Sequence, residues 1–475
     1  MAATGGPAEE AETRRFSFLK GDVDAAAPPG NAAFDWDRAA ATVRENLTEA
    51  MNARHVAFLL GSGCSSYVVE DEDDEEDLIG DAEDDAAGDD EDDDGDEDGD
   101  DKRLELGVPT MGPLASDFHD AWADDDQPNR LTKAEHDLLK EKLGFDADGG
   151  DCAGNLERLL ETLYSFKFIL AQTDNKEMLK AKDTVDAVIG KVTRFITGKC
   201  SDGEFSSGDD TVLKLYQSFY RKLIYRDRGL PRPWVFTTNY DLFNERAMDR
   251  LGIPYCNGFS GTVERRFNPA NFRYALAEQL DLANRKWTAV DNFVYFAKLH
   301  GSISWVEEKS GLFPIREFQS PPEDGDGRVM IYPTPAKQNA SFASPYSDLF
   351  REFQHRIVRE QSVLFTIGYG FGDEHVNNII FQALTVPTFR LIALVPPTAG
   401  GVVRTLKKLK DPRIWLIGGE GPDEDSRAHY FDVFLEKFMP DAPGDRIDKA
   451  VEKVLKAVAD AKDAESADGD AGDDR

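Results

Sequence analysis

Three segments of the chain place small and polar residues directly after a short apolar run. Residues 235–241 end in Thr-Thr-Asn-Tyr-Asp, residues 297–302 contain Lys-Leu-His-Gly-Ser, and residues 365–373 end in Gly-Tyr-Gly-Phe-Gly-Asp. Histidine and aspartate are common proton-transfer groups near neutral pH, and a positioned asparagine can hold a substrate or a water. The strands of an α/β sheet deliver such groups at their carboxyl ends. The three segments therefore predict one shared site.

A fourth segment, Gly-Ser-Gly-Cys-Ser at residues 61–65, follows the apolar run at residues 55–60. Glycines at 61 and 63 would let the backbone approach a pyrophosphate closely, and amide groups of the loop and of a following helix would offset its charge. An ordinary tight turn after a strand is the alternative interpretation of this loop.

The polar residues have structural alternatives as well. Asn239 and Asp241 would cap a helix expected from residue 242. Asp373 would either cap the helix expected from residue 374 or bind a ribose hydroxyl. A lone histidine usually has a structural role, but His300 precedes a glycine at a strand end, where an imidazole can face a pocket and act as a base.

Alternating strand and helix patterns are expected to position these segments. Strands are predicted at residues 55–60, 234–238, 293–299, 329–331, 363–367, 390–395 and 414–417, and helices at 36–54, 242–251, 348–361, 374–384 and 427–438. This alternation predicts an α/β fold with a Rossmann-like, doubly wound parallel sheet. Between residues 104 and 229 the periodicity is almost entirely helical, which predicts a helical module inserted into the sheet domain.

The same patterns divide the 475-residue chain into segments. They are a disordered N-terminus (1–34), an α/β domain (35–69 and 230–420), an acidic disordered insert (70–103), a helical module (104–229), C-terminal helices (421–460) and a disordered acidic tail (461–475). The stretch from Glu70 to Asp101 holds 23 of the 91 acidic residues and no Lys or Arg. Such a run is typical of a solvated insert, and a nucleic-acid mimic or a partner-docking segment is the alternative.

Composition excludes several functional classes. The net charge of −36 and the lack of clustered Lys and Arg disfavour direct binding of nucleic acid. The four cysteines are scattered singly, so neither a disulfide framework nor a zinc site is expected. No signal peptide is recognisable, and no apolar run approaches the roughly 20 residues that span a bilayer. We therefore expect a cytoplasmic protein without a metal and without a membrane partner.

On these motifs the chain resembles the sirtuin-like (Sir2-like) family, and specifically its bacterial branch of NAD-consuming antiviral-defence effectors. The resemblance covers roughly residues 53–418. It rests on Gly-Ser-Gly-Cys-Ser in place of Gly-Ala-Gly-x-Ser, on Thr-Thr-Asn-Tyr-Asp, on Leu-His-Gly-Ser, and on a glycine-rich loop in which Gly370 replaces the usual serine. A Pro-x-x-x-Lys segment within residues 332–337 also matches. Residues 155–163 are similar to a helix over the substrate cleft, although packing within the helical module is the alternative.

The resemblance implies that NAD+ is the substrate and assigns roles to individual residues. Asn239 would hold the nicotinamide-side ribose or a water, His300 would contact the ribose hydroxyls and act as general base, and Asp241 would orient nicotinamide or Asn239. The residues implied to bind NAD+ are Gly61, Ser62, Gly63, Ser65, Thr238, Gly368, Tyr369 and Asp373.

The predicted activity is that of an NAD+ glycohydrolase, which releases nicotinamide and ADP-ribose in antiphage defence. A protein deacylase is an alternative, although the four-cysteine zinc module that usually accompanies deacylation is missing from the sequence. An ADP-ribosyltransferase and a non-catalytic NAD or ADP-ribose sensor are further alternatives. The resemblance also implies a homo-oligomer, controlled by a defence partner such as a helicase-like ATPase.

Overall fold

The computed structural model describes residues 15–30, 32–70, 103–120, 130–204, 209–281, 286–308, 314–320, 328–331 and 344–441. The chain divides into two compact units. The first comprises Met1–Cys64 and Leu213–Arg475, and the second comprises Ser65–Val212.

A nine-stranded sheet forms the core of the first unit. Its strands are β1 (Phe16–Lys20), β2 (Val23–Asp24), β3 (His55–Leu60), β6 (Trp234–Thr237), β7 (Tyr255–Cys256), β12 (Val294–Lys298), β16 (Ser362–Ile367), β17 (Arg390–Leu394) and β18 (Ile414–Gly419). They lie in the order β2-β1-β18-β17-β16-β3-β6-β12-β7. The strands from β18 to β7 are parallel, and β1 runs antiparallel to β18.

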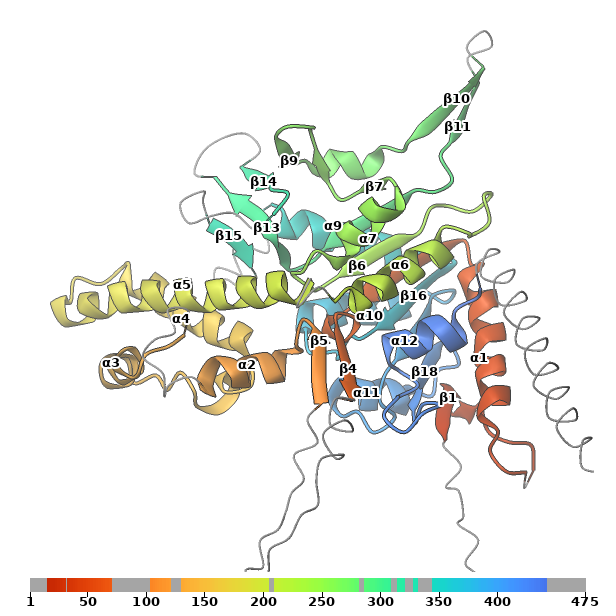
Figure 1. The fold of residues 1–475 in the computed structure, drawn as a ribbon, viewed down its shortest axis with the longest axis horizontal. Coiled ribbons are helices and arrows are strands. Elements are labelled where there is room, and N and C mark those ends of the chain that lie inside the picture. The colour runs from red at the N-terminus through yellow and green to blue at the C-terminus, as the bar shows by residue number, and fades with distance from the viewer. Residues whose placement is uncertain are drawn as a thin grey trace, which may run out of the picture. The chain divides into compact units, whose positions relative to one another are not determined.

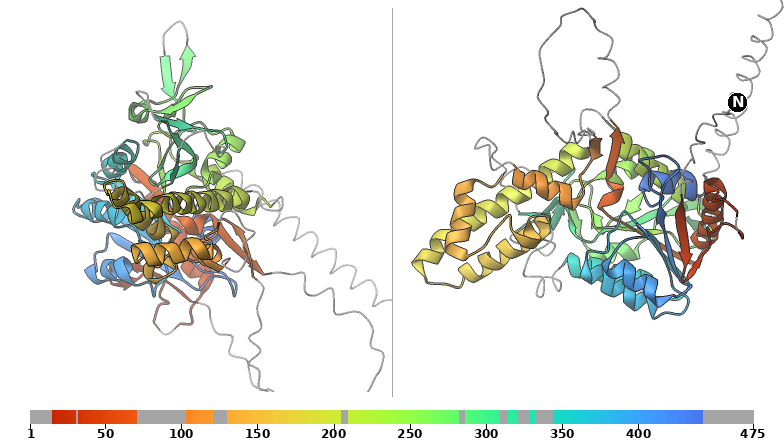
Figure 2. Two further views of the ribbon diagram at one scale, coloured as in Figure 1. Left: turned by 90° about the vertical axis from the view of Figure 1, so that its left-hand side faces the viewer. Right: turned by 90° about the horizontal axis from the view of Figure 1, so that it is seen from below.

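Helices cover both faces of this sheet, as Figures 1 and 2 show. Phe58 of β3 contacts Phe219 of α6 (Thr211–Leu223), and Phe236 of β6 contacts Phe353 of α9 (Tyr346–Ile357). In the parallel register Phe58 pairs with Val235, so Phe58 and Phe236 point to opposite faces. Burial on both faces explains why the central strands read as continuous apolar runs. The predicted Rossmann-like, doubly wound α/β sheet is confirmed.

The strand order places a switch point beside β3. From β3 the chain adds β6 on one side and later returns to add β16, β17 and β18 on the other. Ligands of open α/β sheets bind outside the carboxyl ends of the strands at such a point. The strand ends that follow β3, β6, β12 and β16 are therefore the part of the fold where a site is expected.

The expectation that residues 1–34 are disordered is wrong for β1. Phe16–Lys20 pairs with β18 over its whole length, and Phe16 and Phe18 are buried. The Phe16 ring also packs against Trp36 of α1 (Trp36–Met51) and against Phe438. The strand forms because the exposed edge of β18 offers it hydrogen bonds and an apolar face, neither of which is visible in the local composition.

A second, smaller sheet in the first unit was not predicted. Its strands, in the order β15-β13-β14-β9-β8, are β8 (Phe259–Ser260), β9 (Arg265–Phe267), β13 (Gly301–Glu307), β14 (Ile315–Glu317) and β15 (Arg328–Ile331). The strand predicted at 329–331 thus belongs to this antiparallel sheet and not to the main one. A separate hairpin joins β10 (Ala277–Asp281) to β11 (Lys286–Ala289). Because β13 begins directly after His300, it fixes the chain on both sides of that residue.

The remaining helices of the first unit are α7 (Phe243–Leu251), α10 (Glu374–Leu384), α11 (Gly401–Leu409), and α12 (Phe431–Val433) with a π turn at Phe434–Phe438. Of these helices, α7 and α10 lie where they were predicted, α11 was not predicted, and the last helix begins four residues later than predicted. Among the described residues of the segment 421–460, which was expected to be helical, α12 and the π turn at Phe434–Phe438 are the only helical elements. The rest of that segment and the acidic tail lie outside the described residues, as do residues 71–102 of the acidic insert.

The second unit is mainly helical, as predicted. It contains a hairpin of β4 (Ser66–Glu70) and β5 (Arg103–Gly107), followed by α2 (Met111–Asp120), α3 (Lys133–Leu143), α4 (Leu156–Leu170) and α5 (Lys176–Glu204). A Thr132–Glu135 capping box starts α3, and Asn155 caps α4. Both helices pack against α5 within the unit. The predicted boundary at residue 229 is too late, since most of α6 belongs to the first unit.

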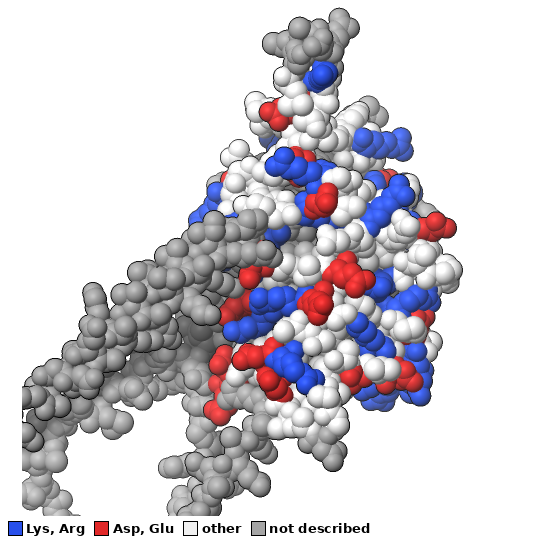
Figure 3. Space-filling model, turned by 90° about the vertical axis from the view of Figure 1, so that its right-hand side faces the viewer, with Lys and Arg blue, Asp and Glu red and all other residues white. Residues whose placement is uncertain are grey.

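The charge of the surface and the hydropathy of the helices indicate whether nucleic acid or a membrane is a suitable partner. On the face drawn in Figure 3, Lys and Arg side chains are interspersed with Asp and Glu, so this face carries no continuous basic patch of the kind that binds a nucleic-acid backbone. Within the described ranges, no helix combines the length and the hydropathy needed to cross a membrane.

Candidate active site

The predicted site segments follow four neighbouring strands and meet at one edge of the sheet. The backbone N–H of Thr238 donates to Leu60 O (3.2 Å), Leu299 N–H donates to Thr237 O (2.8 Å), and Gly61 N–H donates to Ile367 O (2.9 Å). These bonds connect the ends of β6 with β3, of β12 with β6, and of β3 with β16. Glycine 61, Asn239, His300 and Gly368 therefore lie on consecutive strand ends, although their individual roles remain predictions.

The two glycine loops pack directly against each other. A Cβ atom on Gly61 would lie 2.4 Å from Gly368 O, and one on Gly63 would lie 3.0 Å from Gly368 Cα. Gly368 itself has a φ of +61°, and its Cβ would lie 2.6 Å from Cys64 N. Glycine is required at these positions so that the loops after β3 and β16 can touch.

Several amides of the first loop are already used inside the protein. Gly61 N–H donates to Ile367 O, Gly63 N–H to Gly368 O (3.1 Å), and Cys64 N–H to Gly61 O (3.0 Å). The predicted use of this loop as an amide cradle for pyrophosphate thus falls mainly on Ser62, whose side chain is exposed. Ser65 is buried and is the first residue of the second unit. Burial also raises the pKa of the Cys64 thiol, which argues against a thiolate nucleophile.

Asn239 connects β6 to the first glycine loop. Its Nδ2 donates to Gly61 O (2.9 Å) and lies 3.5 Å from the hydroxyl of Tyr216 on α6. Its backbone N–H donates to Thr237 Oγ1 (3.0 Å), whose hydroxyl in turn donates to Leu60 O (2.8 Å). The side chain is buried and held at the end of β6, and its two possible roles, helix cap and ligand contact, both stay predictions.

Asp241 does contribute to the start of α7. Its Oδ1 accepts a hydrogen bond from Phe243 N–H (3.2 Å), the first residue of that helix. Asp241 is 2% exposed. Asp241 thus binds the first amide of α7, although the N-cap residue itself is Leu242, and a second role beside Asn239 remains a prediction.

Lys298 is a buried cation beneath these strand ends. Its ammonium donates to the backbone oxygens of Tyr240 (3.3 Å) and Asp241, and lies 3.1 Å from Glu245 Oε1. Its Nζ also approaches Ser302 Oγ (3.4 Å). Lys298 thus holds the carbonyl groups of the Asn239–Asp241 turn, which fixes the backbone that carries both predicted catalytic side chains.

Glu245 is the carboxylate partner of Lys298. Burial raises its pKa to about 7, even though the nearby ammonium acts in the opposite direction. The side chain is on α7 and is 8% exposed. A buried ion pair of this kind gives little net stability but is costly to break.

His300 and Asp373 form a close side-chain pair at this edge. Its Nε2 lies 2.6 Å from Asp373 Oδ2, and both side chains are largely buried. A carboxylate that accepts from one ring nitrogen fixes the tautomer and orientation of an imidazole, and leaves the basic lone pair on the other nitrogen. This is the arrangement of a histidine that takes up a proton.

Asp373 divides its two oxygens between the helix and His300. Oδ1 accepts from the N–H groups of His375 (2.7 Å) and Val376 (3.1 Å), so Asp373 is the N-cap of α10. Burial alone would raise its pKa, but the hydrogen bond and charge of His300, together with these two amides, hold the pKa well below its usual range. Of the two predicted roles, the cap is confirmed, while the oxygen that was expected to meet a ribose contacts His300.

The loop that leads to Asp373 is held by Tyr369 and Asn377. The Tyr369 hydroxyl donates to Asn377 Oδ1 (3.1 Å), and Asn377 Nδ2 donates to Phe371 O (2.8 Å). These bonds stabilise Phe371 at a φ of +58°, which is unusual for a residue with a side chain. Apart from its chain neighbours, no described residue has an atom within 4 Å of a Cβ placed on Gly370, so a serine would fit there.

Lys298, Glu245, Tyr216 and Asn377 were missed as site residues. The only sequence signal was the position of Lys298 at the end of an apolar strand, directly before Leu-His-Gly-Ser. The segment at residues 332–337, predicted to match the family, lies outside the described residues.

One cluster in the described part of the chain has side chains that could hold a metal. In the second unit, His136 Nε2 lies 2.9 Å from Asp146 Oδ1 and 3.0 Å from Asp148 Oδ1. Lys140 Nζ lies 2.9 Å from Asp146 Oδ2 and already places a cation beside the two carboxylates. The sequence predicted no metal site, and this cluster is adequately explained as an ion-pair network.

The doubly wound sheet, its switch point and the polar strand ends define a Rossmann-like α/β domain with a ligand site at the carboxyl edge. Residues 233–400 match the family model of the SIR2-like domain. This match covers about a third of the chain and identifies a SIR2-like domain within the first unit; such domains use NAD as substrate or cofactor. No curated protein matches the sequence significantly.

Proposed function

We propose that this protein is an NAD+ glycohydrolase, which cleaves NAD+ to nicotinamide and ADP-ribose. The observation that carries the proposal is the His300–Asp373 pair on the strand end beside that of Asn239. Binding alone would not need a histidine oriented by a carboxylate. The match to a SIR2-like domain supports NAD+ as the substrate.

The reaction breaks the bond between the ribose anomeric carbon and the nicotinamide nitrogen. Nicotinamide leaves as a neutral molecule, so the ribose carbon passes through an oxocarbenium-like state, as in glycoside cleavage. The oxygen of a water then bonds to this carbon, and the water gives up one proton. The protein must position the ribose and the water, stabilise the positive charge and accept the proton.

The residues of the site suit these tasks. The imidazole of His300 would accept the proton from the water, and Asp373 would stabilise the imidazolium that results. Asn239, held by Gly61 O, would position the ribose or the water. The buried carboxylate of Asp241 would contribute negative charge close to the developing oxocarbenium ion.

An enzyme that drains NAD+ must be silent in a growing cell. We therefore propose that the protein acts in antiphage defence, as a homo-oligomer or under control of a partner such as a helicase-like ATPase. This biological role rests on the motifs shared with defence effectors.

The test is to incubate purified full-length protein with NAD+ and to separate nicotinamide and ADP-ribose by chromatography. Asn239→Ala and His300→Ala should each lower nicotinamide release about 10²–10⁴-fold, the usual contribution of a positioned proton-transfer group. His375→Ala is the matched control, since this exposed histidine follows the same loop and should change the rate less than about threefold.

Three outcomes would overturn the proposal. Equal activity of His300→Ala and wild type would remove His300 from the mechanism. Nicotinamide release only in the presence of an acetyl-lysine peptide would identify a deacylase instead. NAD+ binding without any product would favour the sensor.

A further inference from the structure

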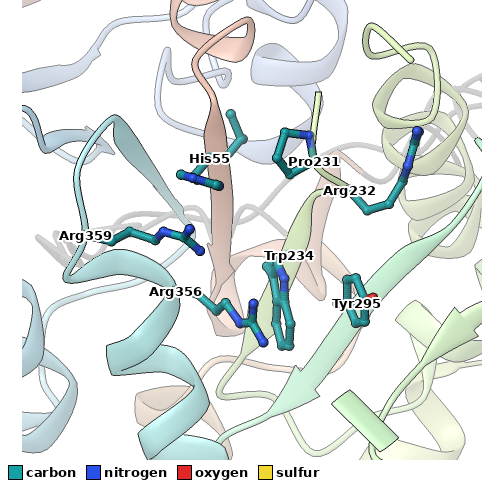
Figure 4. Close-up of a pocket in the computed structure, with 8 residues that line it drawn as sticks. His55, Pro231, Arg232, Trp234, Tyr295, Arg356 and Arg359 are labelled. Carbon is teal, nitrogen blue, oxygen red and sulfur yellow. The ribbon is translucent and has the colours of Figure 1, made fainter. Parts of the chain in front are cut away.

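A cavity of about 320 Å³ lies at the opposite edge of the same sheet. It is lined by His55, Val56, Pro231, Arg232, Trp234, Tyr295, Arg356 and Arg359 (Figure 4). His55 and Trp234 are the first residues of β3 and β6, and Tyr295 is near the start of β12. The cavity is therefore at the amino ends of strands whose carboxyl ends carry Gly61, Asn239 and His300, and it is a separate site.

One wall of the cavity is aromatic and preformed. Trp234 stacks on Tyr295 with ring centres 4.6 Å apart and planes at 7°, and the guanidinium of Arg356 lies 4.2 Å from the Trp234 ring centre. Figure 4 shows Trp234 between Arg356 and Tyr295. Glu352 holds Arg356 in place through an ion pair of 2.9 Å. A planar guanidinium fixed in this way offers a flat surface for stacking as well as hydrogen-bond donors.

The cationic groups around the cavity are not all neutralised. Arg232 pairs with Asp291 (3.1 Å) and Arg356 pairs with Glu352. In the part of the chain that the structure describes, the guanidinium of Arg359 makes no hydrogen bond or ion pair, and neither does the imidazole of His55. Figure 4 shows the side chains of His55, Arg356 and Arg359 directed toward the same space.

The charges around the cavity also favour the binding of an anion. The pKa of His55 is lowered to about 4, first by burial and then by the charges of Arg359, Arg54, Arg226 and Arg356. Burial and the neighbouring Arg356 and Arg54 likewise lower the pKa of Arg359. His55 is therefore neutral at pH 7, and the repulsion is that among the guanidinium groups of Arg359, Arg356 and Arg54, which a bound anion would relieve. In a chain with a net charge of −36, such a local excess of positive charge is unusual.

We propose that this cavity binds a small phosphate monoester, with the phosphate beside Arg359 and His55 and the organic group against the guanidinium of Arg356. Guanidinium groups bind phosphate oxygens through paired hydrogen bonds, which suits the unpaired fork of Arg359. The volume is at the lower end of the range for ligand pockets, about 300–1,000 Å³, so the ligand is no larger than a mononucleotide. This binding does not depend on the reaction proposed for the other edge.

The test uses isothermal titration calorimetry on full-length protein at constant ionic strength, with inorganic phosphate and AMP as probes. We expect AMP to bind at least tenfold more tightly than phosphate, because only AMP has a base that can stack on the guanidinium of Arg356. Arg359→Ala should weaken the binding of both probes at least tenfold. Arg351→Ala removes the same charge from an exposed position on α9, where Arg351 pairs with Asp348, and should change the affinity less than twofold.

The controls separate this site from the NAD+ site and from misfolding. AMP affinity should be unchanged by His300→Ala, which lies at the other edge of the sheet. Arg359→Ala should retain the wild-type circular dichroism spectrum, because its guanidinium contacts no described partner. Equal weakening by Arg351→Ala and Arg359→Ala, equal affinity for phosphate and AMP, or no binding of either probe to the wild type would overturn the proposal.

Discussion

The two oxygens of Asp373 have different partners, the amides of α10 and His300, so substitutions of Asp373 should lower the stability of the protein by different amounts. Asp373→Asn keeps an oxygen for the N–H groups of His375 and Val376, since asparagine caps helices as well as aspartate does. The substitution removes the charge that faces His300 at 2.6 Å. A hydrogen bond to a charged group contributes about 1.5–3 kcal/mol to stability, so Asp373→Asn should lower the free energy of unfolding by that amount. Asp373→Ala also loses the cap and should cost about 1 kcal/mol more.

The assay is urea denaturation of both variants, His300→Ala and the double variant Asp373→Asn/His300→Ala. The coupling energy of this cycle should be about 1.5–3 kcal/mol, because the two side chains share one hydrogen bond. The pairing lowers the folded pKa of Asp373. Its contribution is therefore present above the unfolded pKa of about 3.9 and is lost as the pH falls through the folded value. The coupling should persist from pH 7 to pH 5 and decline below pH 4.

Three results would refute this reasoning. The first is that Asp373→Asn unfolds at the same urea midpoint as the wild type. The second is that Asp373→Asn and Asp373→Ala are equally stable. The third is a coupling energy below about 0.5 kcal/mol, which is the limit for independent sites. Asp348→Asn serves as a control, since it breaks an i,i+3 pair with the exposed Arg351 and should cost less than about 0.5 kcal/mol.

Two further predictions concern the backbone of the site. Lys298→Met should lower the free energy of unfolding by about 3–5 kcal/mol, because it leaves Glu245 buried without its partner. Urea denaturation of the double variant Lys298→Met/Glu245→Gln should show that part of this stability is restored. Gly368→Ala should cost about 1–2 kcal/mol and lower the melting temperature, because the φ of Gly368 is +61° and the new Cβ would meet Cys64 N. Gly372→Ala is the control: the space around its Cβ is open, so this variant should melt within about 2 °C of the wild type. Equal melting temperatures of the two variants would contradict the packing of the loops.

The sequence predicted the strand ends because their signals are local. A buried parallel strand reads as a continuous apolar run, and the first polar or glycine residue after it marks the end. This placed Gly61, Asn239 and His300 after β3, β6 and β12 with errors of one residue at most. The parallel arrangement then required these ends to share one edge.

The partners of these residues could not be predicted in the same way. Asp373 meets His300 only because the chain returns from β12 to place β16 on the far side of β3. Lys298 at the end of a strand would normally be solvated, and its burial depends on Glu245 and on carbonyl groups of the preceding strand end. The strand at Phe16–Lys20 was missed because it needs the edge of β18, which is distant in sequence. Each error concerns a long-range contact that local periodicity does not encode.

The two edges of the sheet differ in the charge that they would stabilise. The carboxyl edge carries the buried carboxylate of Asp241 and the partly buried one of Asp373, which would suit the proposed ribose that becomes positive as nicotinamide leaves. The amino edge carries Arg359 and Arg356, which would oppose that charge and suit a phosphate instead. NAD+ has both kinds of group, so the proposed binding at the carboxyl edge requires its pyrophosphate to lie away from the two aspartates. The exposed Ser62 on the first glycine loop is the predicted contact for it, because the amides of Gly61 and Gly63 already donate within the protein.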